Sequence, residues 1–145
     1  MITIALSCLL LVVLTTVIHY EALRALGSSL SRLDVPARAK LIVVILATFL
    51  AHSLEMLLYG FAFFALVHYF GLGTLGGHGA LTLTQSVYFS AETYTSLGFG
   101  DIVPTGPIRL LAGAETLNGL LLIGWTASYT YIAMERYWRA NGAPR

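Results

Sequence analysis

The stretch Thr95-Ser96-Leu97-Gly98-Phe99-Gly100-Asp101 decides how this chain folds. Its two glycines alternate with apolar residues, and glycine is the residue that takes positive φ values most readily, so an unusual backbone conformation is expected here. The stretch lies between two long apolar segments, 41–70 and 107–138, and follows a shorter one, 82–95. The helices predicted on either side must hold this loop in place.

The composition is that of a membrane protein. Of the 145 residues, 57% are apolar and only 10% are charged, and the mean hydropathy is +0.80. A water-soluble domain of this size could not bury so much apolar surface, so we expect the chain to lie in a lipid bilayer. The net charge of +1, without a basic run, gives no indication of nucleic acid binding. The single cysteine, Cys8, excludes a disulfide within the chain.

Three segments are long enough to span a membrane. The first, from residue 2 to about residue 26, is interpreted as a retained transmembrane helix, because neither a positively charged start nor a cleavage site is clear. A polar connection up to residue 40 leads to the second, 41–70, and a glycine-rich loop predicted to be flexible follows it. The third segment, 107–138, starts with a proline, which suits the first turn of a helix.

The segment 82–95 is too short to span. Thr82 and Gln85 have the spacing of a capping box, which predicts that a new helix starts here. Its length of roughly 20 Å is less than the ~30 Å hydrocarbon core. A short helix followed by a loop must enter the membrane partway and turn back, enclosed by protein or facing water.

The basic residues predict the orientation. Seven of the eight Lys and Arg lie between residues 24 and 40 or after residue 135, and the eighth is Arg109. Cytoplasmic loops are the ones enriched in Lys and Arg. We therefore expect the N-terminus and the glycine-containing loop outside, and the C-terminus inside.

A second motif precedes the loop, with the sequence Tyr88-Phe89-Ser90-Ala91-Glu92-Thr93-Tyr94. Together the two motifs resemble small bacterial potassium-channel-like pore domains, in which an aromatic pair precedes Ser-Val-Glu-Thr and the filter commonly reads Thr-Val-Gly-Tyr-Gly-Asp. The resemblance covers about residues 41–138. It implies an all-α membrane protein with three transmembrane helices, a re-entrant pore helix and a selectivity-filter loop, which forms a tetrameric pore.

The same resemblance divides the chain into two parts. Residues 1–40 would be an N-terminal transmembrane helix with its cytoplasmic connection, and residues 41–145 the pore domain. Within the pore domain the resemblance implies an outer helix at 41–70 and a pore helix at 82–95. The filter would follow at 96–101, and the inner helix at 107–138.

By this resemblance, the backbone of the filter binds K⁺ and neighbouring side chains brace it. The ion-binding residues would be Ser96, Leu97, Gly98, Phe99 and Gly100. The supporting residues would be Tyr88, Phe89, Glu92, Thr95 and Asp101, with the Glu92 and Asp101 carboxyls as a buried pair behind the filter that shares a proton or is bridged by water. Leu97 departs from the β-branched residue of the family pattern and is less stiff at χ1, so a nonselective filter remains an alternative.

The inner helix also matches, with Arg109 followed by Gly119 and Gly124. In the family the first glycine is a gating hinge, and the alternative is that both glycines permit close helix packing. The i, i+4 row from Gly119 is expected to line the cavity and inner mouth, and comprises Ile123, Ala127, Tyr131 and Glu135. Tyr131 would be a constriction, and Glu135 either a ring of carboxylates or an interfacial partner of the nearby arginines.

Two pairs of polar residues lie within the apolar segments. His52 and Glu55 share a face of the second segment, and Glu115 and Asn118 a face of the third. Ionisable groups in a membrane face protein or water, so each is a functional candidate. We expect one hydrogen-bonded network between the two helices, either sensitive to pH through His52 or permanently neutral. A zinc site is a further alternative, with only two or three ligands in view.

The sequence therefore predicts a passive cation channel that assembles as a homotetramer in the lipid bilayer. Potassium selectivity is the first expectation, with K⁺ as the permeant ion. We expect no other cofactor and no enzymatic activity. A bacterial plasma membrane is the expected location. One alternative is a nonselective monovalent cation channel. A remote one is a membrane protein that binds metal or transfers protons through His52, Glu55 and Glu115.

Overall fold

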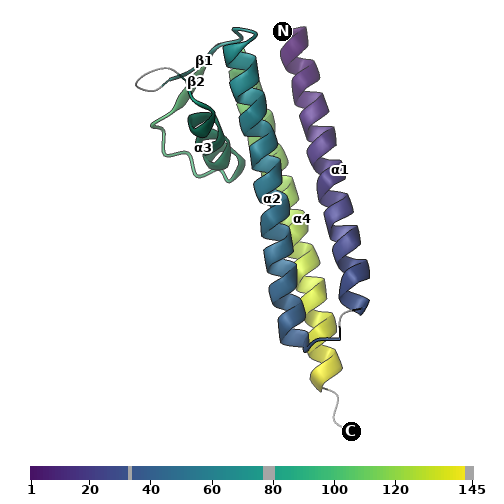
Figure 1. Ribbon diagram of the computed structural model, residues 1–145. Coiled ribbons are helices and arrows are strands. Elements are labelled where there is room, and N and C mark those ends of the chain that lie inside the picture. Colours follow the sequence, from purple (N-terminus) through teal and green to yellow (C-terminus); the bar gives the residue numbers. More distant parts are fainter. Residues whose placement is uncertain (33, 77–80, 143–145) are drawn as a thin grey trace.

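The computed structural model describes residues 1–32, 34–76 and 81–142. Three long helices lie side by side, and a short helix with two short strands lies to one side of them near one end (Figure 1). The elements in chain order are α1 (Ile2–Arg32), α2 (Ala37–His68), β1 (Thr74–Gly76), α3 (Leu83–Tyr94), β2 (Val103–Thr105) and α4 (Ile108–Gly142).

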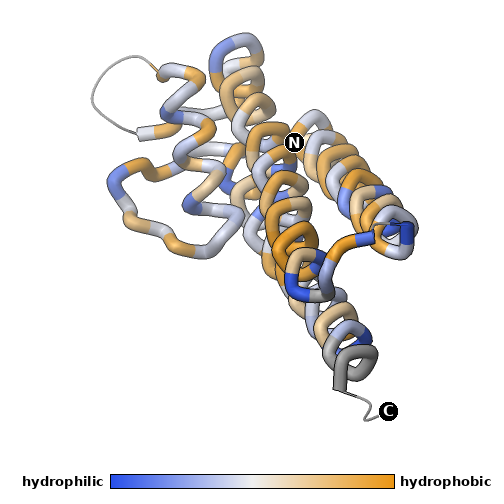
Figure 2. The backbone as a smooth tube through the Cα atoms, turned by 60° about the horizontal axis from the view of Figure 1, so that its bottom comes forward, coloured by the Kyte–Doolittle hydropathy of each residue, from blue (hydrophilic) through white to orange (hydrophobic). Residues whose placement is uncertain are grey.

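The three long helices have the length and composition of membrane spans. At 1.5 Å per residue each is longer than the ~30 Å hydrocarbon core, so its ends project or the helix tilts. Apolar residues run along all three (Figure 2), and many of their large side chains are exposed to the surroundings rather than packed inside the chain. The chain is an integral membrane protein of helical fold, as the composition indicated.

The first helix is longer than the sequence suggested. Gly27, Ser28 and Ser29 were expected in a polar connection, but α1 continues through them to Arg32. Serine hydroxyls are satisfied inside the helix, because Ser28 donates to the carbonyl of Ala25 at 2.9 Å, one turn earlier. Leu30 is buried in a small apolar cluster with Val44 and Ala133, so packing against α2 and α4 extends the helix.

The glycine-rich segment after α2 is not simply a flexible loop. Its residues Thr74–Gly76 form β1, which pairs antiparallel with β2, the segment that follows the filter stretch. The hydroxyls of Thr74 and Thr105 lie 2.6 Å apart across this ribbon. Pairing between segments so distant in sequence cannot be read from local composition, and it fixes where the filter stretch ends. Residues 77–80 of the predicted loop lie outside the described residues.

The start of α3 matches the sequence prediction. Thr82 is its N-cap, and the capping box is confirmed: the Gln85 N–H donates to the Thr82 hydroxyl at 3.2 Å, and the Thr82 N–H donates to the Gln85 side chain at 2.9 Å. The helix has 12 residues, which is about 18 Å. It is too short to cross the bilayer, as predicted.

Close packing against α2 positions α3. Gly60 lies directly against the backbone of Val87, where an added Cβ would come within 2.8 Å of the Val87 Cα. Phe63 and Phe89 meet edge to face with ring centroids 5.0 Å apart. Ser90 donates a 2.7 Å hydrogen bond to the carbonyl of Met56. These contacts hold α3 at a defined position along α2.

Gly60→Ala is expected to lower the stability of the protein by about 1–3 kcal/mol, because the new methyl group overlaps backbone that cannot move away. The measurement is the thermal unfolding midpoint of the purified protein in detergent. Gly124→Ala is the matched control, since among the described residues nothing beyond its own stretch of helix lies within 4 Å of its added Cβ. Equal midpoints for the two variants would contradict the close α2–α3 contact.

Candidate functional site

The stretch after α3 has an alternating backbone. Ser96, Gly98 and Gly100 have φ values of +60°, +55° and +80°, whereas Leu97 and Phe99 between them do not have positive φ. Alternation in the sign of φ is the pattern that lets successive carbonyls line one side of a chain. Ser96 is the one non-glycine residue with positive φ among those described, which marks it as a strained position of the kind found at functional sites.

Hydrogen bonds fix the start of this loop to the end of α3. The N–H groups of Leu97 and Gly98 donate to the carbonyl of Glu92 at 2.9 and 3.4 Å, and the Ser96 N–H donates to the carbonyl of Thr93 at 3.1 Å. The Thr116 hydroxyl of α4 lies 3.2 Å from that same Thr93 carbonyl. The start of the loop is therefore attached to the end of α3, which is itself hydrogen-bonded to α4.

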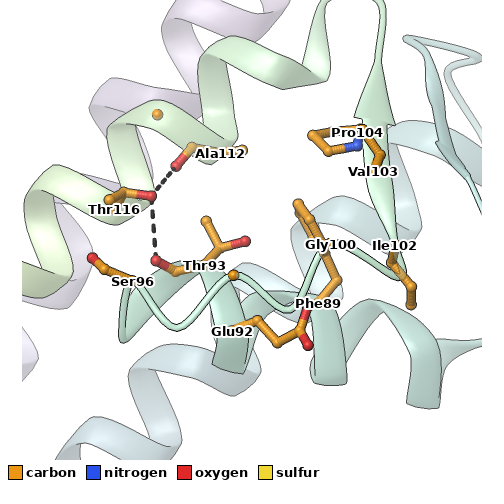
Figure 3. A pocket seen from close by; sticks show the side chains of 12 residues that line it. Phe89, Glu92, Thr93, Ser96, Gly100, Ile102, Val103, Pro104, Ala112 and Thr116 are labelled. Carbon is orange, nitrogen blue, oxygen red and sulfur yellow. Dashed lines mark hydrogen bonds between the residues drawn. The ribbon is translucent and has the colours of Figure 1, made fainter.

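An open cleft of about 450 Å³ separates the loop from the N-terminal part of α4. Figure 3 shows Ala112 and Thr116 on the α4 side and Phe89 and Glu92 on the α3 side. Ile102, Val103 and Pro104 close one end, next to the β1–β2 ribbon. The large side chains of Leu97 and Phe99 are 59% and 68% exposed, so the chain alone does not cover the loop.

The expected carboxyl pair is not in direct contact. Glu92 is buried and one of its oxygens, Oε1, has no hydrogen-bond partner among the described residues, while Asp101 is exposed. Both carboxyls interact with the Tyr88 hydroxyl, and its hydrogen bond to Glu92 is the main cause that raises the pKa of Tyr88. Phe89 is buried against α2, and Thr95 caps the end of α3.

The inner-helix glycines have different surroundings. An added Cβ at Gly119 would collide with the backbone carbonyl of Tyr94 and lie 3.0 Å from its carbon, which favours the close-packing interpretation of this glycine. Gly124 has open space beside it. Ile123, Ala127 and Tyr131 are exposed and Glu135 is half-buried, so most of the predicted lining row is uncovered in the single chain.

A polar cluster joins all four helices. Its members are His19 of α1, His52 and Glu55 of α2, Tyr94 of α3 and Thr126 of α4. The Nδ1 atoms of His19 and His52 lie 3.0 and 3.1 Å from the two Glu55 oxygens. Tyr94 donates its hydroxyl proton to Glu55 as well, and its oxygen lies 2.8 Å from His52 Nδ1.

The other two residues predicted for this network, Glu115 and Asn118, have different hydrogen-bond partners. Glu115 Oε1 lies 2.5 Å from the Ser90 hydroxyl oxygen, whose single proton is also within reach of the Met56 carbonyl, and the other Glu115 oxygen is buried without a partner among the described residues. The Asn118 side-chain amide donates to Thr15 at 2.8 Å and to Tyr59 at 3.3 Å. The four residues predicted to form one network therefore hydrogen-bond in separate groups, because His52 and Glu55 turn toward α1 and Tyr94.

Sequence reasoning missed His19, Tyr94 and Thr126. His19 carried a usable signal, since an ionisable residue inside an apolar segment is a functional candidate by itself. Tyr94 was counted only as part of the motif, and Thr126 looks like any small polar residue in a membrane helix. Only the packing of the helices brings them together: α1 and α3 bring His19 and Tyr94 to Glu55, and α4 brings Thr126 to the two histidines.

Comparison with known proteins defines the class. A family described as ion channel matches residues 40–136, which is well over half of the chain, and this chain belongs to that family. It is therefore an ion-channel protein of the membrane and not an enzyme. The chain is similar to Two-pore potassium channel 1 of Arabidopsis thaliana, with 37% identity over 51 residues, which cover 34% of this chain and 14% of the plant protein. No solved structure matches.

Tyr94→Phe is expected to destabilise the protein by about 1–3 kcal/mol, because it removes a donor to the buried Glu55 carboxyl and leaves that group short of a partner. Thermal unfolding in detergent measures the effect. Tyr69→Phe, at an exposed tyrosine just after α2, is the control and should leave the midpoint within the error. If the two variants have the same unfolding midpoint, the Tyr94 hydroxyl adds nothing to stability.

Proposed function

We propose that this chain is the subunit of a passive, potassium-selective channel that assembles from four copies. The observation that carries the proposal is the alternating φ at Ser96, Gly98 and Gly100, directly after a short helix that cannot span the membrane. The similarity to a plant protein named a potassium channel supports it.

Conduction would use backbone oxygens. Carbonyls of the stretch 96–100, together with the Ser96 hydroxyl, replace the water around a dehydrated K⁺, and ions advance by displacing one another. The C-terminal end of α3 carries the negative end of the helix dipole, which favours a cation at the inner side of the filter. No covalent chemistry is required of any side chain.

Assembly follows from the incompleteness of one chain. A single copy supplies one filter strand, and a closed pore needs several around an axis. The exposed Leu97 and Phe99 and the uncovered row Ile123, Ala127 and Tyr131 are surfaces for neighbouring copies and the pore. In this assembly residues 41–145 form the pore domain, with Tyr131 at the inner constriction and Glu135 at the inner mouth.

The orientation follows the basic residues. With residues 24–40 and the C-terminal region in the cytoplasm, the N-terminus and the filter face the outside of a bacterial plasma membrane. Figure 1 shows that α1 runs antiparallel to α2 and that α4 runs in the same direction as α1.

The nonselective channel is the second candidate, and Leu97 is the reason. A β-branched residue is stiffer at χ1 and would restrain the filter more firmly than the flexible and exposed Leu97. The same fold would then pass Na⁺ and K⁺ alike.

Reversal potentials of the purified protein in planar bilayers, measured under opposed K⁺ and Na⁺ gradients, distinguish the candidates. A potential close to the K⁺ equilibrium value is expected, and one near zero would favour the nonselective channel. Leu97→Val should move the reversal potential toward the K⁺ value or leave it there. Absence of conductance in protein that elutes as a tetramer would contradict the proposal.

Gly98→Ala is expected to abolish K⁺ current, because a side chain at φ +55° is strained by roughly 1–2 kcal/mol in every copy and the filter backbone changes. The readout is current per reconstituted tetramer. Gly27→Ala on α1 is the control, since its added Cβ makes only an ordinary 3.4 Å contact with the Tyr129 hydroxyl. Normal current in Gly98→Ala would exclude the 96–100 backbone as the ion path.

A further inference from the structure

Three ligand atoms from two helices converge in the interior of the protein. One ring nitrogen of His19 on α1, one of His52 on α2 and a carboxylate oxygen of Glu55 all lie within 4.8 Å of one another. His19 and Glu55 are fully buried, and the side chain of His52 is 15% exposed. We propose that His19, His52 and Glu55 form a binding site for a divalent transition metal of the zinc class, separate from the ion path.

The donor set and its spacing suit such an ion. Zn²⁺ is bound by histidine nitrogens and carboxylate oxygens at about 2.0–2.2 Å in a tetrahedron, which puts neighbouring ligand atoms about 3.3 Å apart. The two nitrogen–oxygen separations here are 3.0 and 3.1 Å, so a small expansion admits the ion. Tyr94 is the last residue of α3, and the negative end of that helix dipole favours a cation beside it.

The Nε2 atoms of both imidazoles have a hydrogen-bond partner of the kind that orients metal-binding histidines. The Nε2 atoms of His52 and His19 lie 2.9 and 3.1 Å from one oxygen, the Thr126 hydroxyl of α4. A histidine that binds metal through Nδ1 carries a proton on Nε2 and donates it to a second group, which fixes the ring. The Thr126 oxygen has two lone pairs and can accept from both rings.

Counting protons shows that one arrangement of neutral histidines is left unsatisfied, whereas a His52 tautomer that accepts from Tyr94 at Nδ1 and donates from Nε2 satisfies the cluster without an added cation. If both histidines are neutral and donate from Nδ1 to Glu55, both Nε2 atoms must accept, yet the Thr126 hydroxyl has one proton and can donate to only one of them. A metal between the Nδ1 atoms and Glu55 removes this conflict, because both Nε2 atoms then become donors. One extra proton on one ring would also remove it, but it would not require a second histidine from a separate helix at the same carboxylate.

The site gives α1 a connection to the filter. His19 is the α1 ligand, and Tyr94, which contacts both Glu55 and His52, is followed directly by the filter stretch. A bound ion would tie α1 to the helix pair that carries the loop and stabilise this arrangement over any in which the helices separate. The site does not depend on which ion the pore conducts.

The test uses the full chain in detergent after removal of metals with a chelator. Calorimetric titration with Zn²⁺ should give one ion per chain, and Co²⁺ should give the visible absorption bands of a tetrahedral site. His19→Gln should weaken binding at least 10-fold, and Thr126→Ala 10–100-fold, as for other residues that orient ligands. His68→Gln, at the exposed end of α2, is the control and should bind as wild type.

A second readout covers variants that fold poorly. Zn²⁺ should raise the unfolding midpoint of the wild type and of His68→Gln but not that of His19→Gln. Equal Zn²⁺ binding by wild type and His19→Gln, or no binding by wild type, overturns the proposal. A wild-type midpoint that responds to pH but not to Zn²⁺ assigns the position to a proton and overturns it too. None of these outcomes involves conduction, so they are independent of the proposed channel function.

Discussion

A loop inside a bilayer must satisfy its backbone polar groups within the protein, and this constraint organises the molecule. α3 enters only partway, so its end and the stretch behind it need partners that water would otherwise supply. The carbonyl of Glu92 accepts from two N–H groups of the loop, and the Thr93 carbonyl lies beside the Thr116 hydroxyl. The β1–β2 ribbon then holds the exit of the loop.

The depth of α3 depends on close backbone approaches. Gly60 on α2 packs against Val87, and Gly119 on α4 packs against the Tyr94 carbonyl, so the short helix is contacted by two long helices. In lipid, helices associate through such packing and through polar contacts rather than through burial of apolar surface. The Phe63–Phe89 contact and the hydrogen bond from Ser90 to Met56 add to the same attachment. The pore-helix segment is thus held by features spread over two long helices.

Much of the site was accessible from the sequence because the signals are local. The capping box at Thr82 and Gln85, the shortness of 82–95 and the glycines of the filter stretch all act within a few residues. The predicted end of α1 was wrong because the packing of Leu30 outweighs the weak helix preference of the glycine and serines before it. The β1–β2 pairing was missed because its strands are separated by α3 and the filter stretch, and three residues each carry little pattern.

By itself, the sequence determined that the chain is a membrane protein with three spans and a re-entrant segment, because hydropathy, length and capping are local properties. It also identified Ser96 to Gly100 as the stretch with a special backbone. Only the tertiary structure decided the partners of the buried polar groups: Glu55 meets His19 and Tyr94, whereas Glu115 meets Ser90. A helix face has several polar residues within reach of a neighbour, and their pairing depends on the rotation and depth of each helix, which no local pattern specifies.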